Sequence, residues 1–240
     1  MQFYFIRHAQ STNNRLYDQT GSWKGRSHDP ELTDIGLRQA ERLGQSLRQA
    51  GSNGANGTWD PQNVNGFGIT HVYSSLMIRA AHTGSIVARA LELPLMPWDD
   101  LHETGGMYLD DEATGEKIAQ PGLARAEMAE RFPNLVLPDS MYESGWWNRP
   151  FEEPEQWLAR ARRVLDELTT RHGSTNDHVA VISHGGFYYH LMTTLLGMPA
   201  TDGFWFLMNN TGITRIDFED DHVTLMYQNR VDFLPRDLIT

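Results

Sequence analysis

The chain has 240 residues, no cysteine and a formal net charge of −11, from 20 Lys and Arg against 31 Asp and Glu. The absence of cysteine excludes disulfide scaffolds, thiolate metal sites and thiol catalysis. The acidic balance argues against a protein that coats nucleic acid or an anionic membrane, so neither is an expected partner.

The expected location is cytoplasmic. No window approaches the ~18 apolar residues that a membrane-spanning helix needs. The first apolar run, Phe3 to Ile6, is too short for a signal peptide.

Apolar periodicity predicts the elements of the first half of the chain. They are a buried strand over 3–6, a helix capped by Thr33 and running to about Gln49, a strand over 69–74, a helix over 76–91 and an extended segment over 94–98. A stretch rich in Gly and Asn, residues 51–68, has little periodicity and is expected to be a loop insertion.

The second half begins with residues 104–153, which we expect to form a lid-like insertion containing a short helix near 123–132. The elements that follow are a helix over 154–171 begun by Pro154, a strand over 179–182, a helix ending at Leu196, and a hairpin of strands over 213–218 and 222–228. Alternating strands and helices predict one α/β domain, residues 1–240, with a mainly parallel sheet.

Ligands of such sheets bind at the carboxyl ends of the strands, and several polar side chains fall there. Arg7 and His8 follow the first strand, and His184 follows the strand over 179–182. Arg79 comes one helical turn after the strand that ends at Ser74, and Glu103 follows the extended segment. Each residue alone has an ordinary structural explanation, but five at equivalent positions predict one site.

The segments around these residues resemble the motifs of the histidine phosphatase superfamily, which has the phosphoglycerate-mutase-like fold. In chain order the segments are Arg7-His8-Ala9-Gln10-Ser11-Thr12-Asn13-Asn14, Asp29-Pro30-Glu31-Leu32-Thr33-Asp34-Ile35-Gly36, Ser74-Ser75-Leu76-Met77-Ile78-Arg79-Ala80-Ala81-His82-Thr83, Leu101-His102-Glu103 and Ser183-His184-Gly185-Gly186. Five motifs in the family's order are a specific signal. The resemblance implies a three-layer α/β/α sandwich.

The resemblance also implies roles for individual residues. It makes His8 the nucleophile, Glu103 the proton donor, and Arg7, Arg79 and His184 the groups that hold the phosphoryl oxygens. It places Ser11, Asn14 and the Gly185 amide near the phosphoryl group as further substrate contacts. Met107 and Tyr108 are added as substrate contacts from their position just after Glu103. The enzyme implied is a histidine acid phosphatase-type phosphomonoesterase that acts on a small phosphorylated metabolite without a cofactor. The histidines show no metal-ligand spacing, so no catalytic metal is expected.

Elementary chemistry agrees with these roles. Neutral imidazole is a competent nucleophile near pH 7 if its second nitrogen has a fixed acceptor, and neighbouring Arg charges should lower the pKa of His8. Because a Glu is normally ionised at pH 7, Glu103 must be held protonated or take its proton from the bound phosphate. Ala9 stands where the family usually has Gly, so a negative φ is expected there.

Three functions remain open: a phosphatase, a cofactor-dependent phosphoglycerate mutase, and a phospho-ligand binding module without catalysis. A mutase needs a second basic cluster, whereas residues 104–153 offer only scattered basic side chains among many carboxylates. We therefore favour the phosphatase. Trp146, Trp147 and Tyr142 either form an apolar wall for the leaving group or pack the insertion onto the body.

Overall fold

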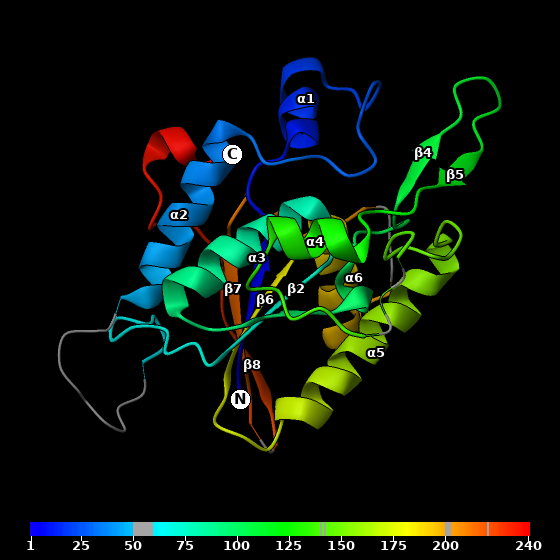
Figure 1. The fold of residues 1–240 in the computed structure, drawn as a ribbon. Coiled ribbons are helices and arrows are strands. Elements are labelled where there is room, and N and C mark those ends of the chain that lie inside the picture. The colour runs from blue at the N-terminus through cyan, green and yellow to red at the C-terminus, as the bar shows by residue number, and fades with distance from the viewer. Residues whose placement is uncertain (50–59, 140, 142, 200–202, 220) are drawn as a thin grey trace.

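The computed structural model describes residues 1–49, 60–139, 141, 143–199, 203–219 and 221–240. They form a three-layer α/β/α sandwich, in which helices cover both faces of a central sheet (Figure 1). This is the predicted fold class. The predicted loop over 51–68 lies partly outside the described residues, and its described part, from Asp60 onward, forms turns.

The order of the strands places the ends of four of them at one edge of the sheet. Within the described residues the order is β3 (Leu95–Pro97), β2 (His71–Ser74), β6 (His178–Ser183), β1 (Gln2–Arg7), β7 (Ile213–Phe218) and β8 (Val223–Arg230). The first four run parallel, and the predicted β7–β8 hairpin adds antiparallel strands beside β1. The register pairs Arg7 with Ser183 and Ser74 with Ile182, so the motifs that follow these strands meet at the same edge.

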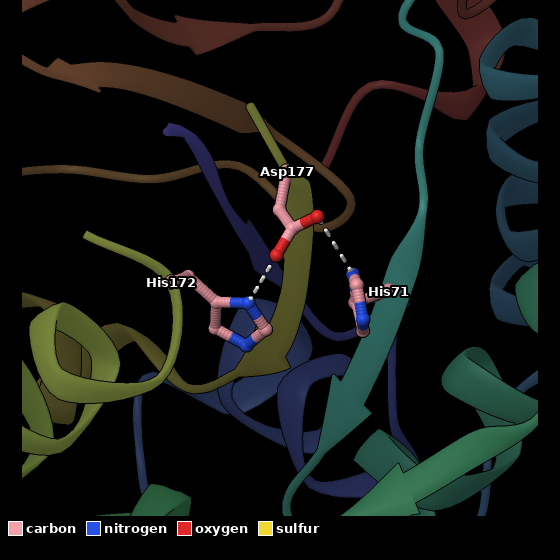
Figure 2. Close-up of side chains that lie close together, drawn as sticks. All are labelled: His71, His172 and Asp177. Carbon is pink, nitrogen blue, oxygen red and sulfur yellow. Dashed lines mark hydrogen bonds and ion pairs between the residues drawn. The ribbon is translucent and has the colours of Figure 1, made fainter. Parts of the chain in front are cut away.

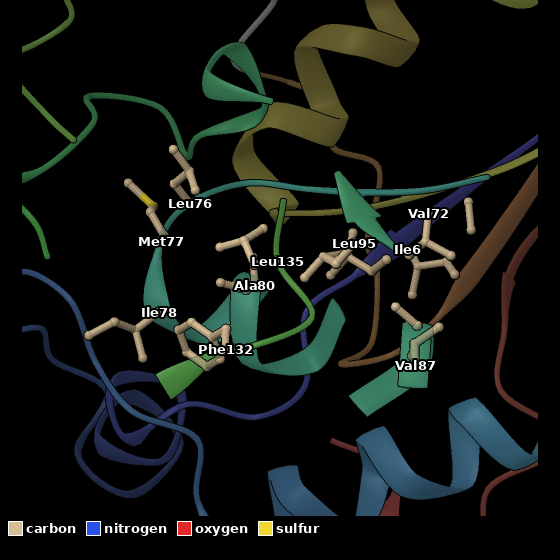
Figure 3. Close-up of a cluster of buried hydrophobic side chains, with 14 of the residues drawn as sticks. Ile6, Val72, Leu76, Met77, Ile78, Ala80, Val87, Leu95, Phe132 and Leu135 are labelled. Carbon is tan, nitrogen blue, oxygen red and sulfur yellow. The ribbon is translucent and has the colours of Figure 1, made fainter. Parts of the chain in front are cut away.

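Side chains of β1 alternate between two cores, because successive residues of a strand point to opposite faces. Tyr4 and Ile6 pack with α2 (Asp34–Arg48) and α3 (Ile78–Leu91). Figure 3 shows Ile6 and other side chains of this core. Phe3 and Phe5 pack on the other face with α5 (Pro154–His172) and α6 (Gly185–Leu195). Each fully buried side chain of this size stabilises the fold by about 1.5–3 kcal/mol.

One helix was not predicted, α1 (Thr12–Thr20). It begins at a capping box, in which the Ser11 hydroxyl accepts from the Asn14 amide and the Asn14 side chain accepts from the Ser11 amide. None of the residues of α1 is buried. Its sequence contains only two large apolar residues, Leu16 and Tyr17, so it lacks the apolar stripe by which a helix is predicted from sequence.

The segment over 104–153 contains a hairpin of β4 (Tyr108–Asp110) and β5 (Lys117–Ala119), then α4 (Arg125–Arg131). Trp146 and Trp147 are buried in the core on the α3 side of the sheet, and Gly106 lies directly against the Trp147 ring. Of the two alternatives for these tryptophans, the structure supports packing of the segment onto the body. Tyr142 lies outside the described residues.

Short 3-10 helices complete the chain, η1 (Asp99–Leu101) before the predicted acid and η2 (Arg236–Leu238) near the C-terminus. The longest helix, α5, carries polar residues along its length. None of the helices in the described ranges is long and apolar enough to cross a membrane.

Candidate active site

Arg7, His8, Arg79 and His184 come together at the carboxyl edge of the sheet, as predicted. His8 follows β1, and its backbone amide donates to the Ser183 carbonyl at 2.9 Å, which extends the β1–β6 ladder by one bond. His184 follows β6 and is the N-cap of α6. The centroids of the two imidazole rings lie 5.1 Å apart.

The ring of His8 is held in a defined orientation. Its Nδ1 lies 2.7 Å from the Ala9 carbonyl, the fixed acceptor that the sequence argument requires, so Nδ1 carries the proton and Nε2 keeps its lone pair. The Nε–H of Arg79 donates to that Nε2 at 3.1 Å. Burial, followed by the charges of Arg79 and Arg7, lowers the pKa of His8 well below its ordinary value. The effect of the arginines was predicted, but burial is the larger cause.

Arg79 lies in the first turn of α3 and faces a carboxyl group. Its Nη1 is 4.0 Å from Oδ1 of Asp29, and the same oxygen accepts from the Ile78 amide at 2.9 Å. Burial raises the pKa of Asp29 to about 7, against the opposing effect of Arg79. Thr83, one turn further along α3, accepts from the Ala9 amide at 3.0 Å and so fixes the backbone beside His8.

His184 and Arg7 bring polar atoms to the site that lack partners among the described residues. Both ring nitrogens of His184 and the Nε of Arg7 are buried without a hydrogen bond. Burial, with Arg79 next, lowers the pKa of His184 well below its ordinary value. Arg7 is anchored through Nη1, which donates to the Met208 carbonyl at 2.5 Å. A phosphoryl group would supply acceptors for the Nε–H of Arg7 and for the one ring N–H of neutral His184.

Glu103 lies at the N-terminus of α6. Its Oε1 accepts from the Phe187 amide at 2.9 Å and from the Thr104 amide at 2.9 Å, and its Oε2 accepts from the Gly186 amide at 3.2 Å. Its charge raises the pKa values of Arg7 and Arg79, against the larger effect of their burial. Glu103 is therefore within electrostatic reach of both arginines.

A buried ion pair supports the loop that carries Glu103. Arg160 of α5 donates to both carboxylate oxygens of Glu152, at 2.6 and 2.8 Å, and also to the carbonyls of Asp100 and His102 at 2.7 and 2.9 Å. The His102 Nδ1 in turn lies 2.8 Å from the Glu103 carbonyl. Arg160 is 1% exposed, so this network is shielded from water.

The remaining predicted contacts lie in different surroundings. The side chains of Ser11 and Asn14 bond each other in the cap of α1. Gly185 begins α6 beside Arg7, since a Cβ added to Gly185 would lie 3.6 Å from the Arg7 Nε. Met107 is fully buried in the core, and Tyr108 lies half-buried in β4 under the Arg26 guanidinium, 4.4 Å from its ring centroid. Their contact with substrate stays a prediction.

Backbone geometry beside His8 is also specialised. Ala9 is not among the described residues with positive φ, as expected for an alanine at this position. Thr211, by contrast, has a φ of 59°, which is unusual for a β-branched residue, and its amide donates to the Arg7 carbonyl at 3.0 Å. The preceding Asn210 donates to the His8 carbonyl at 2.9 Å. Backbone strain at Thr211 thus lies next to the predicted nucleophile.

Sequence reasoning missed Asp29 as the partner of Arg79, and it missed Arg160. Asp29 carries no signal of its own, because its partner is 50 positions away and only the fold brings them together. Arg160, by contrast, did carry a signal in the sequence. It lies three residues after Trp157 and four before Val164, on the apolar stripe of the helix, where a charged residue must find a buried partner.

The fold and this arrangement of two histidines, two arginines and one glutamate define a phosphoryl-transfer site. The family model of the histidine phosphatase superfamily (branch 1) matches residues 3–55 and 61–230. The chain belongs to this superfamily.

Curated relatives and solved structures agree with the family and differ in their named activities. A relative from Yersinia pestis named "Probable phosphoglycerate mutase" is 25% identical over 222 residues, covering 92% of this chain and 86% of its own. A phosphoserine phosphatase from Entamoeba histolytica has a TM-score of 0.61 at 22% identity, covering 98% and 99% of the two chains. An alpha-ribazole phosphatase from Shigella flexneri has a TM-score of 0.59 at 21% identity, covering 96% of each. At these identities the structures establish the shared fold.

Proposed function

We propose that the protein is a phosphatase that hydrolyses a small phosphomonoester through a phosphohistidine at His8. In the first step the Nε2 lone pair attacks phosphorus, the bond to the leaving oxygen breaks, and Glu103 gives its proton to that oxygen. In the second step Glu103 takes a proton from water, the water oxygen attacks phosphorus, and the N–P bond breaks to release orthophosphate.

The observation that carries this proposal is the hydrogen bonding of His8. With Nδ1 against the Ala9 carbonyl, only Nε2 is left to attack, and Arg79 points its Nε–H at that nitrogen. The depressed pKa of His8 keeps the nucleophile unprotonated at neutral pH. Arg7, Arg79 and His184 would bind the phosphoryl oxygens, where charge develops in the transition state.

The proton that Glu103 donates has a natural source in the substrate. Both oxygens of this carboxylate accept backbone N–H donors, an arrangement that suits the ionised form. We therefore propose that Glu103 receives its proton from the monoanion of the phosphomonoester as the substrate binds.

The pairing of the basic side chains in residues 104–153 favours the phosphatase over the mutase. Each basic residue there lies near a carboxylate: Lys117 with Asp110 at 2.6 Å, Arg125 with Asp139 at 3.7 Å, Arg131 with Glu31 at 2.6 Å and Arg149 with Asp100 at 3.8 Å. A mutase must hold a bisphosphorylated intermediate, and these paired cations do not form the second basic cluster that it would need.

The named activities of the relatives define the test. The Yersinia pestis relative carries the name of a mutase, whereas the structural neighbours from Entamoeba histolytica and Shigella flexneri carry the names of phosphatases. A panel of phosphorylated metabolites should be scored for phosphate release, and separately for conversion of 3- to 2-phosphoglycerate with a bisphosphoglycerate primer. We expect release without conversion. Efficient primed conversion would establish the mutase instead.

The nucleophile has its own test. His8→Ala should abolish hydrolysis of p-nitrophenyl phosphate, and rapid quenching of the wild type should trap an acid-labile phosphoprotein that the variant does not form. Substantial turnover by His8→Ala would exclude His8 as the nucleophile. If the variant binds phosphate but the wild type hydrolyses no ester in the panel, the protein is a binding module.

A further inference from the structure

A second group of polar side chains lies at the opposite edge of the sheet. His71 is the first residue of β2, His172 is the last residue of α5, and Asp177 directly precedes β6 (Figure 2). Because β6 extends over six residues at about 3.3 Å each, this group lies roughly 16 Å or more from the end of the strand that carries His184. It belongs to no part of the proposed phosphatase site.

The two histidines direct their Nδ1 atoms toward one carboxylate, as Figure 2 shows. The Nδ1 of His172 is 2.8 Å from Oδ2 of Asp177, and the Nδ1 of His71 is 3.9 Å from Oδ1. The potential ligand atoms of the three residues all lie within 4.8 Å of one another. In a tetrahedral zinc site, ligand atoms about 2.1 Å from the ion lie roughly 3.4 Å apart, so small side-chain rotations would complete the geometry.

The surroundings suit a metal ion as well as the ligands do. The Nε2 of the buried His172 lies 3.1 Å from the Tyr73 hydroxyl, which could accept its proton and so orient Nδ1 toward an ion. The side chains of His71 and Asp177 are 38% and 27% exposed, which leaves a path for an ion and room for a water ligand. Two imidazoles and one carboxylate are ligands that Zn²⁺ and related divalent ions accept.

We propose that His71, His172 and Asp177 form a binding site for one divalent transition-metal ion of the Zn²⁺ class, separate from the phosphoryl site. The ion would join the C-terminal end of α5 to the first residues of two central strands. It would therefore stabilise the fold without taking part in phosphoryl transfer. The sequence gives no ligand-spacing motif for this site, because His71 lies 101 positions before His172.

The test is a titration of the chelator-treated full chain with Zn²⁺ by calorimetry, and with Co²⁺ by visible absorption. We expect one saturable ion per chain, a rise in melting temperature with Zn²⁺, and no comparable binding of Mg²⁺. His71→Gln, at a partly exposed position, should weaken the affinity for Zn²⁺ at least tenfold and remove the Zn²⁺-dependent rise in melting temperature.

A matched control and an independent readout accompany this variant. His222 is an exposed histidine 3.1 Å from Glu219, so His222→Gln removes an imidazole–carboxylate pair of the ordinary surface kind and should leave the affinity unchanged. Hydrolysis of p-nitrophenyl phosphate by His71→Gln should match the wild type, which shows that the variant is folded. Asp177→Asn provides a second ligand variant and should also bind at least tenfold more weakly.

Two results would overturn the proposal. One is a wild type that binds no stoichiometric Zn²⁺ or Co²⁺. The other is a set of ligand variants that bind as tightly as His222→Gln, in which case the three residues form only a hydrogen-bonded ion pair. Because these measurements concern metal binding and melting temperature, they stand whether or not the chain hydrolyses phosphomonoesters.

Discussion

Replacing Gly186 with alanine should displace the proposed catalytic acid while leaving the fold intact. Gly186 lies in the first turn of α6 and is not among the glycines with positive φ, so alanine can adopt its backbone conformation. A Cβ at this position would lie 2.5 Å from Oε1 of Glu103 and 2.8 Å from Oγ1 of Thr104. Both atoms are at the ends of polar side chains, so we expect these side chains to move while the helix backbone keeps its position.

The size of the displacement follows from the contact distance. Ordinary van der Waals contact for a Cβ begins near 3.4 Å, so Oε1 must retreat by about 0.9 Å, the difference between 3.4 and 2.5 Å. The same movement weakens the bonds that Glu103 accepts from the Gly186 and Phe187 amides. A misplacement of about 1 Å can lower the rate of an enzymatic step about 100-fold.

The assay compares leaving groups. Acid assistance matters most when the leaving oxygen is basic, and kcat/KM reports the first step, before Glu103 acts as base. The kcat/KM for alkyl phosphates should therefore fall about 100-fold in Gly186→Ala, whereas kcat/KM for p-nitrophenyl phosphate should change little. Gly185→Ala is the matched comparison, because a Cβ there meets no atom closer than 3.6 Å. The loss of rate caused by Gly185→Ala should vary less from one leaving group to another than the loss caused by Gly186→Ala.

A double-mutant cycle decides whether the effect passes through Glu103. In a Glu103→Gln background, where no acid remains to be displaced, Gly186→Ala should have little further effect on alkyl phosphates. Equal losses of kcat/KM for all leaving groups in Gly186→Ala, or additive effects of the two substitutions on kcat/KM, would refute the assignment of Glu103 as the acid. Helical alanine is about 1 kcal/mol more favourable than glycine, so a large loss of stability would show that the crowding is relieved by the helix instead.

Three further predictions concern acid stability, the buried ion pair and metal independence. The pKa values of His8, His102 and His184 are lowered well below 6.5 in the folded chain. Below about pH 6.5 the unfolded chain therefore binds up to three more protons than the folded chain, and the free energy of unfolding falls as the pH is lowered. Asp29, whose pKa is raised to about 7, binds one proton more in the folded chain between about pH 4 and 7 and so offsets one of the three histidines. The net expectation is that the free energy of unfolding falls as the pH is lowered from about 7 to 5. Urea denaturation at several pH values measures it, and a flat profile would contradict the burial of neutral histidines. Arg160→Met leaves a buried carboxylate unpaired and should lower the free energy of unfolding by about 3–5 kcal/mol, whereas a loss below about 1 kcal/mol would show that the network contributes little. Hydrolysis of p-nitrophenyl phosphate should persist after treatment with a chelator, and activity restored by a divalent ion would contradict the metal-free mechanism.

Much of the fold was predictable because its signals are local. The strand at the N-terminus, the helix capped by Thr33 and the strand before His184 each have a clear apolar pattern and ends within two residues of those observed. The meeting of His8 and His184 then follows from parallel pairing alone, since neighbouring parallel strands end at the same edge. The location of the site therefore needed only the order of the elements and their type.

The parts that escaped prediction depend on contacts between distant residues. Arg7 is anchored by the Met208 carbonyl, 201 positions away, and Asp29 meets Arg79 across 50 positions. Nothing in the local sequence marks either partner. The group of His71, His172 and Asp177 escaped for a related reason. His172 and Asp177 are five positions apart, but His71 lies 101 positions before His172, so no ligand-spacing motif links the three residues.

The net charge of −11 and the burial of the cations together explain how an acidic protein can bind an anion. Arg79 is buried and Arg7 is partly buried, and burial lowers the pKa values of both. Each charge therefore lies where the low dielectric constant of the surroundings screens it less than water would. The Nε of Arg7 and both nitrogens of His184 lack hydrogen-bond partners among the described residues. Their burial lowers the stability of the folded chain unless a ligand forms these hydrogen bonds. A phosphoryl group offers acceptor oxygens to the Nε–H of Arg7 and to the one ring N–H of the neutral His184. Because such short-range bonds are screened far less than the surface field, selection by this pocket should depend on the fit of the phosphoryl group and not on long-range attraction.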